Sequence, residues 1–91
     1  MNRYRLEVQT AAQRSLRSLP NRLRAEASQV LLDLREDPVP PDSKPLGREL
    51  HGRRRIRLDG WRIIYTVDES DRRVTVWAIR RRSPDTYLNL P

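Results

Sequence analysis

The segment GRRRIRLDGWRIIYTV, from Gly52 to Val67, predicts a β-hairpin against which the rest of the chain can be placed. Two alternating runs flank Asp59-Gly60, and an Asp-Gly pair between such runs favours a type I′ turn with positive φ at both central residues. This turn sets the register, because each residue before it then faces one residue after it. The expected pairs are Leu58 with Trp61, Ile56 with Ile63, Arg54 with Tyr65, Arg57 with Arg62, and Arg55 with Ile64.

This register divides the hairpin into an apolar face and a basic face. A slip of one residue would bury the arginines and expose the apolar residues, so the register is strongly specified. A rigid sheet that presents clustered guanidinium groups is suited to binding phosphates, because guanidinium forms paired hydrogen bonds with phosphate oxygens. The basic face is expected to carry Arg53, Arg55, Arg57 and Arg62.

The composition predicts one small domain, residues 1–91, with a strongly basic surface. Of the 91 residues, 36% are hydrophobic and 34% are charged. This number of hydrophobic residues is enough to form one small core. The net charge is +7, and Lys44 is the only lysine among 19 basic residues. Such a charge favours a polyanionic partner, which includes nucleic acid, an anionic membrane or an acidic protein. A general preference for arginine codons would give the same composition, so the charge alone is modest support.

The chain has no cysteine, which excludes disulfides, thiolate zinc sites and a thiol nucleophile. The N-terminal sequence MNRYRLEVQT lacks the apolar segment of a signal peptide, and no apolar run approaches membrane-spanning length. We therefore expect a soluble protein of the cytoplasm.

The remaining segments predict an α+β fold with the order β-α-α-β-β-β. Residues 3–8 alternate as a half-buried strand, and apolar residues recur at helical spacing in residues 10–18 and 21–36. Residues 37–45 contain four prolines and predict an ordered connector to the hairpin. We expect a helical hairpin packed on a mainly antiparallel four-stranded sheet.

The last strand is predicted at residues 73–80, and both of its faces are apolar. Such a strand is typical of a central or well-covered position. Simple alternation places Val74, Val76 and Ala78 on one face, and Thr75, Trp77 and Ile79 on the other.

Most catalytic patterns are missing from the sequence. His51 is the only histidine, and a lone histidine in a polar loop is more often a solvated surface residue than a catalytic one. No spacing of ligands predicts a metal site, and no glycine-rich loop predicts a nucleotide cofactor. We therefore predict neither a metal nor a cofactor.

Arginine and tyrosine remain as candidates for chemistry. Guanidinium groups can hold a scissile phosphate and stabilise the charge of a pentacoordinate transition state. Tyrosine has a reference pKa of about 10, and surrounding positive charge would lower that pKa and make it a base for a ribose 2′-hydroxyl. From the residues alone, binding of a polyanion is favoured over catalysis. The candidates that follow the basic hairpin face are Arg80, Arg81, Arg82 and Tyr87.

The sequence LHGRRRIRLDGWRIIYTVD, residues 50–68, together with the element order, resembles the RelE/ParE toxin superfamily of bacterial type II toxin–antitoxin systems. The resemblance also covers the A-x-x-x-L-x-x-L helix from Ala12 to Leu19, the core pattern from Lys44 to Val67, and the tail. It implies a small toxin that a cognate, acidic antitoxin from an adjacent gene neutralises in a hetero-oligomeric complex.

Toxins of the RelE branch cut mRNA in the ribosomal A site by 2′-hydroxyl attack without a metal, so the resemblance implies an endoribonuclease (mRNA interferase) whose partners are the ribosome and mRNA. It further implies that Arg62 and Arg81 stabilise the transition state and that Tyr87 is the base. Both arginine side chains are expected outside the core. The residues expected to contact RNA are Lys44, Arg53, Arg55, Arg57, Arg80 and Arg82.

Two other functions fit the same resemblance. The ParE branch shares the fold but inhibits DNA gyrase without nuclease activity, and the full arginine–tyrosine set favours the RelE branch over it. A relative without catalytic activity would serve only as a partner of its antitoxin, for example in repression of its own operon.

Overall fold

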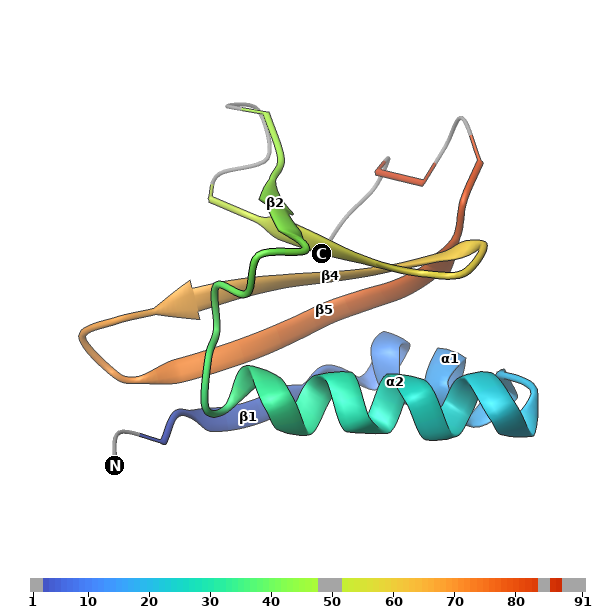
Figure 1. The fold of residues 1–91 in the computed structure, drawn as a ribbon, viewed down its shortest axis with the longest axis horizontal. Helices are drawn as coiled ribbons and strands as arrows, with labels where there is room; N and C mark the ends of the chain where they lie inside the picture. Colours follow the sequence, from blue (N-terminus) through green and yellow to red (C-terminus); the bar gives the residue numbers. More distant parts are fainter. Residues whose placement is uncertain (1–2, 48–51, 84–85, 88–91) are drawn as a thin grey trace.

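The computed structural model describes residues 3–47, 52–83 and 86–87, and in it a helical hairpin covers one face of a five-stranded sheet (Figure 1). Its elements are β1 (Arg5–Val8), α1 (Thr10–Ser18), α2 (Asn21–Leu34), β2 (Ser43–Pro45), β3 (Arg54–Leu58), β4 (Trp61–Asp68) and β5 (Arg73–Arg81). The strand order is β1-β5-β4-β3-β2, with β1 parallel to β5 and every other pair antiparallel. The predicted fold class is confirmed.

The sheet has one strand more than predicted, because part of the proline-rich connector pairs with β3. Ser43 lies opposite Ile56, and Pro45 lies opposite Arg54. Proline favours extended backbone, and a strand at the edge of a sheet tolerates a residue without an N–H group. The predicted connector is thus partly a strand. His51 falls outside the described residues.

The hairpin of β3 and β4 has the predicted register, with all five expected pairs in place. Its turn differs from the expected type I′, because Asp59 has a positive φ of 55° whereas Gly60 does not. The register survives this difference, since two residues still join the paired Leu58 and Trp61.

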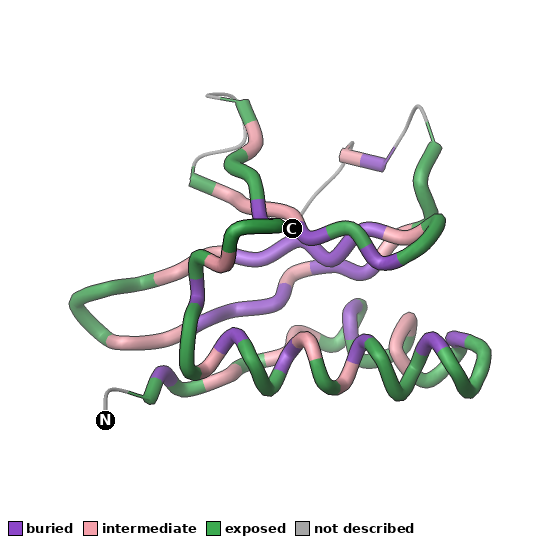
Figure 2. The backbone as a smooth tube through the Cα atoms, viewed as in Figure 1, coloured by how far each residue is buried: buried purple, intermediate pink, exposed green. Residues whose placement is uncertain are grey.

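The core lies between the helices and the sheet, where Figure 2 shows the buried residues concentrated. On α2, Leu23, Ala27, Leu31 and Leu34 form the buried stripe that the helical spacing predicts. They pack against the apolar face of the sheet, whose buried residues come from β3, β4 and β5. These residues are Ile56, Leu58, Ile63, Tyr65, Val74, Val76 and Ile79.

A β-bulge in β5 changes which residues share a face. Ile64 lies opposite Ala78 but Tyr65 lies opposite Val76, so Trp77 is one extra residue on its strand. The prediction that Val74, Val76 and Ala78 share a face is therefore wrong beyond Trp77. Ile79 joins Val74 and Val76 in the core, and Ala78 lies with Ile64 on the face away from the helices.

In the described part of the chain, neither helix is long and apolar enough to cross a membrane. The longer one, α2, has 14 residues.

The connector is held to the sheet by a buried hydrogen bond. The hydroxyl of Tyr65 donates to the carbonyl of Pro38 over 2.8 Å, and Tyr65 is fully buried. Burial raises the pKa of the Tyr65 hydroxyl, which keeps its proton and remains a donor.

We predict that Tyr65→Phe lowers the free energy of unfolding by about 1–2 kcal/mol, because it leaves a buried carbonyl without its donor. Urea unfolding followed by circular dichroism measures this change. Tyr87→Phe is the matched control, because Tyr87 is only half-buried, and its effect should stay within about 0.5 kcal/mol. Equal stability of the two variants would contradict the assigned role of Tyr65.

Candidate functional site

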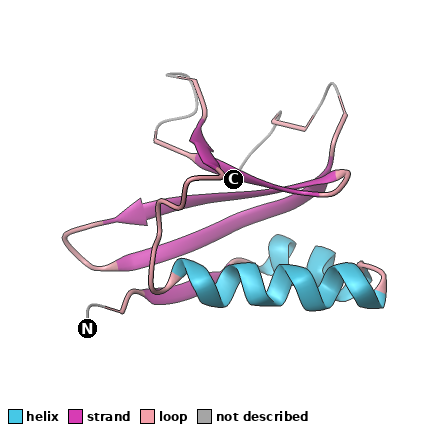
Figure 3. Ribbon diagram, viewed as in Figure 1, coloured by secondary structure: helices cyan, strands magenta, loops and turns pink. Residues whose placement is uncertain are grey.

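The helices cover one face of the sheet (Figure 3). The cross-strand pairing places a row of three arginines on the opposite face, across the three central antiparallel strands. Arg57 on β3 lies opposite Arg62 on β4, which lies opposite Arg80 on β5. Side chains of directly opposed residues point to the same face of a sheet. We call Arg57, Arg62 and Arg80 the arginine row.

Arg62, at the centre of the row, is buried although its side chain carries a charge. It is 6% exposed, and its guanidinium Nη1 donates to the carbonyls of Trp61 over 2.8 Å and Asp59 over 3.3 Å. The expectation that Arg62 lies outside the apolar core holds, but its side chain is far less exposed than the predicted open basic face implies. These two hydrogen bonds connect the Arg62 side chain to the hairpin turn on the face of the sheet opposite the helices.

The charge of Arg62 has no carboxylate partner among the described residues. The ion pairs of this part of the chain use Arg3, Arg5, Arg22 and Arg73, and none involves Arg62 or Arg57. Removing a charge from water without an opposite charge nearby is costly. An anion bound to the row would offset this cost.

The tail folds back to the arginine row. Nη1 of Arg80 donates to the carbonyl of Thr86 over 3.2 Å. Thr86 is 3% exposed, and its hydroxyl oxygen accepts from the N–H of Ser83 over 2.6 Å and lies 2.7 Å from the carbonyl oxygen of Ser83, to which it can donate. Tyr87 follows directly and is half-buried, so these bonds hold it near Arg80.

Arg81 points to the other face. It lies opposite Trp61, whose side chain packs against the core on the side of the helices, and its guanidinium carbon is 5.7 Å from the centroid of the Trp61 ring. The structure therefore brings Arg80, and not Arg81, next to Arg62. The extra residue at Trp77 moves Arg80 to the face that carries Arg62 and moves Arg81 to the opposite face. The alternation in the sequence gives no sign of this extra residue.

The other predicted RNA-binding residues extend the basic face beyond the row. Arg55 is paired with Ile64 on β4 and with Lys44 on the edge strand β2. Arg53 lies against the ring of Trp77, 5.4 Å from its centroid, and the Trp77 indole N–H donates to the Thr66 hydroxyl. Arg82 is exposed just past β5, and its backbone N–H donates to the carbonyl of Gly60 over 2.7 Å.

Within residues 3–47, 52–83 and 86–87, no group of three or more histidine, aspartate or glutamate side chains could hold a metal ion. The chemistry that the described side chains of this face offer is that of guanidinium groups and a tyrosine hydroxyl. Such a set can bind phosphate, neutralise developing negative charge and exchange a proton.

Comparisons with known proteins agree on one family of folds. The sequence model of a family described as the ParE toxin of type II toxin–antitoxin systems, parDE, matches residues 6–86. Toxin RelE of Mycobacterium tuberculosis is 27% identical over 86 residues, which are 94% of this chain and 89% of that protein.

Two solved structures are also similar. A chain of the toxin–antitoxin complex RelBE2 from Mycobacterium tuberculosis is 31% identical, with a TM-score of 0.77 over 88% of this chain and 99% of that one. A chain of the archaeal RelE–RelB complex from Pyrococcus horikoshii is 26% identical, with a TM-score of 0.79 over 92% and 99% of the two chains.

We predict that inorganic phosphate stabilises this protein through Arg62 and not through Arg81. At a free phosphate concentration of ten times the dissociation constant, a single site adds about 1.4 kcal/mol to the free energy of unfolding. Arg62→Met and Arg81→Met remove the same charge, which makes them a matched pair. Thermal unfolding at constant ionic strength should show the phosphate-dependent stabilisation in the wild type and Arg81→Met, and little of it in Arg62→Met. The same loss in both variants would show that net charge, not the row, binds the anion.

Proposed function

We propose that this chain, which belongs to the ParE toxin family of type II toxin–antitoxin systems within the RelE/ParE superfamily, is a toxin that cleaves mRNA on the ribosome. The observation that carries this proposal is the buried guanidinium of Arg62, which has no carboxylate partner among the described residues and lies between two further arginines. A phosphate group has the charge and geometry that such a row binds.

In the proposed reaction, the 2′-oxygen of a ribose attacks the adjacent phosphorus, and the bond from phosphorus to the 5′-oxygen of the next nucleotide breaks. The phenolate form of Tyr87 accepts the proton of the 2′-hydroxyl and becomes the neutral phenol, and the leaving 5′-oxygen takes a proton from solvent. Arg62 and Arg80 stabilise the negative charge of the pentacoordinate phosphate. The products are a 2′,3′-cyclic phosphate and a 5′-hydroxyl end.

The transition-state role that the resemblance gives to Arg81 passes to Arg80 in this proposal. The support is geometric, because Arg80 is the cross-strand neighbour of Arg62 and also binds the segment that carries Tyr87. Arg55, Arg57 and the more distant basic residues Lys44, Arg53 and Arg82 would bind the RNA backbone on either side of the scissile phosphate.

We further propose a cognate antitoxin as the regulatory partner and the cytoplasm as the place of action. The support for the partner is that the similar RelBE2 and archaeal RelE–RelB structures are toxin–antitoxin complexes. An acidic antitoxin segment over the arginine row would block the site and place a negative charge next to Arg62.

A second candidate function is inhibition of DNA gyrase, as the resemblance implies for the ParE branch. The match of residues 6–86 to the ParE family model favours it. It requires neither Tyr87 as a base nor a phosphate in the arginine row, so substitutions in the row separate the two functions.

We predict that the purified toxin, added to a translating cell-free reaction, produces new mRNA 5′ ends that follow the codon phase in primer extension. These ends should carry a hydroxyl, so polynucleotide kinase labels them without prior phosphatase treatment. Tyr87→Phe and Arg80→Met should each lower the cleavage rate by about 100-fold or more, the usual effect of losing a base or a transition-state donor.

Arg81→Met is the matched control for Arg80→Met, and it should retain cleavage within a few-fold of the wild type. Intact mRNA together with loss of DNA supercoiling by gyrase would overturn the nuclease proposal in favour of the second candidate. Loss of cleavage in Arg81→Met but not in Arg80→Met would restore the role that the sequence resemblance gives to Arg81.

A further inference from the structure

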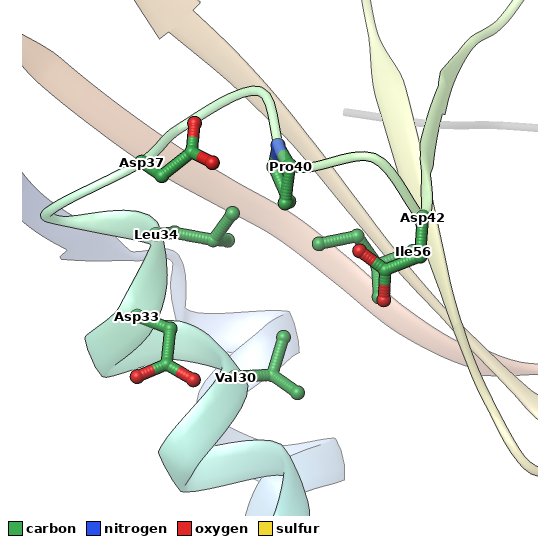
Figure 4. A pocket seen from close by; sticks show the side chains of 7 residues that line it. All are labelled: Val30, Asp33, Leu34, Asp37, Pro40, Asp42 and Ile56. Atoms are coloured by element: carbon green, nitrogen blue, oxygen red, sulfur yellow. The ribbon is translucent and has the colours of Figure 1, made fainter.

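A small pocket lies beneath the connector, where α2 and β3 approach each other (Figure 4). Its volume is about 180 Å³. Leu34 and Ile56 point toward each other across it, and Val30 and Pro40 complete the apolar lining. Ile56 belongs to the face of the hairpin that packs on the helices, so the pocket and the arginine row lie on opposite sides of β3.

Three exposed carboxylates lie at the rim of this apolar pocket, one from α2 and two from the connector: Asp33, Asp37 and Asp42. None of them forms an ion pair with another described residue. On a chain with a net charge of +7, they make a local site of opposite sign. We call the cavity and these seven lining residues the acidic pocket.

The size and chemistry of the acidic pocket select its occupant. Pockets that hold small-molecule ligands usually have volumes of about 300–1,000 Å³, so this one suits a single long side chain better than a nucleotide or metabolite. Its carboxylates repel phosphate groups. An arginine or lysine side chain fits both the apolar lining and the carboxylates. Its methylene stem packs on an apolar surface while its charged end reaches the carboxylates.

We propose that the acidic pocket receives an arginine or lysine side chain of the antitoxin, which rests on the antitoxin partner proposed above. The antitoxin would then have two anchors of opposite charge, an acidic segment over the arginine row and a basic side chain in the acidic pocket. Two surface sites of opposite charge fix the orientation of a partner that carries both an acidic and a basic group. A partner with groups of only one sign could bind only one of the two sites.

The sign of the effect on affinity distinguishes this proposal from general electrostatic attraction. Asp33→Asn and Asp42→Asn make the toxin more basic, which by long-range attraction would strengthen its binding to an acidic antitoxin. If a basic side chain occupies the pocket, each substitution instead weakens binding, by about two- to fivefold, because the inserted cation loses one of its exposed carboxylate partners. Asp37 is left unchanged because its carboxylate accepts a hydrogen bond from the backbone N–H of Val39 within the connector. Asp33 accepts one from the side-chain amide of Gln29 over 2.8 Å, and the amide oxygen of an asparagine can still accept it.

Glu26→Gln is the control for the loss of one negative charge, because Glu26 is exposed on α2 two turns before Asp33. Its ion pair with Arg22 is exposed and contributes little to stability. Calorimetric titration of each toxin variant with the antitoxin from the adjacent gene gives the dissociation constants. Glu26→Gln should bind as the wild type or more tightly, and both pocket variants should bind more weakly. Their thermal unfolding should match that of the wild type, which shows that the fold is kept.

A reciprocal experiment identifies the inserted side chain. Each arginine and lysine of the antitoxin is replaced by methionine and titrated against wild-type and Asp42→Asn toxin. One replacement should weaken binding to the wild type but cause little further loss with Asp42→Asn, which is the signature of a direct contact.

Pocket variants that bind as tightly as the wild type, or more tightly, would overturn the acidic-pocket proposal while leaving the antitoxin partner intact. No binding by the wild-type toxin would overturn both. The cleavage reaction is independent of either result, because Asp33→Asn and Asp42→Asn lie on the other side of β3 and should cut mRNA at the wild-type rate.

Discussion

The pairing of β4 with β5, with its one-residue shift at Trp77, is the constraint on which both faces of the sheet depend. On the helix side, the shift brings Ile79 into the core beside Val76. On the opposite side, it brings Arg80 beside Arg62 and turns Arg81 toward Trp61. A bulge redirects every side chain beyond it on its strand. One inserted residue therefore determines the packing of the core and the composition of the arginine row.

The arginine row concentrates positive charge, and two of its members, Arg57 and Arg62, form no ion pair with a described carboxylate. Arg62 is buried, bonded to two neutral carbonyls, and without an ion-pair partner among the described residues, whereas Arg73 at the start of β5, Arg5 on β1 and Arg22 on α2 form ion pairs with acidic neighbours. Such an arrangement costs stability in the free protein, which is common at sites that bind a ligand of opposite charge. In the function proposed above, the RNA substrate and an acidic antitoxin segment would compete for this one surface.

The connector between α2 and β3 has more than one structural role. Its first part is held to the core by Tyr65 through the Pro38 carbonyl, and its last part pairs with β3 as an edge strand. Between these points it supplies Pro40 and Asp42 to the acidic pocket. The proline content that stops the helix thus also keeps this segment extended and close to the sheet.

Features that depend on local pattern could be predicted from the sequence. The alternation on either side of Asp59-Gly60 determined the hairpin register, because only one register separates the arginines from the apolar residues. Helical spacing on α2 determined its buried stripe, and the motifs from Lys44 to Val67 indicated the toxin superfamily. What only the tertiary structure decided involves residues far apart in the chain. The bulge at Trp77 is set in the pairing of β5 with β4, and the acidic pocket forms where β3 meets α2 and the connector. Residue order alone carries no information on these contacts, since each forms only when distant elements meet.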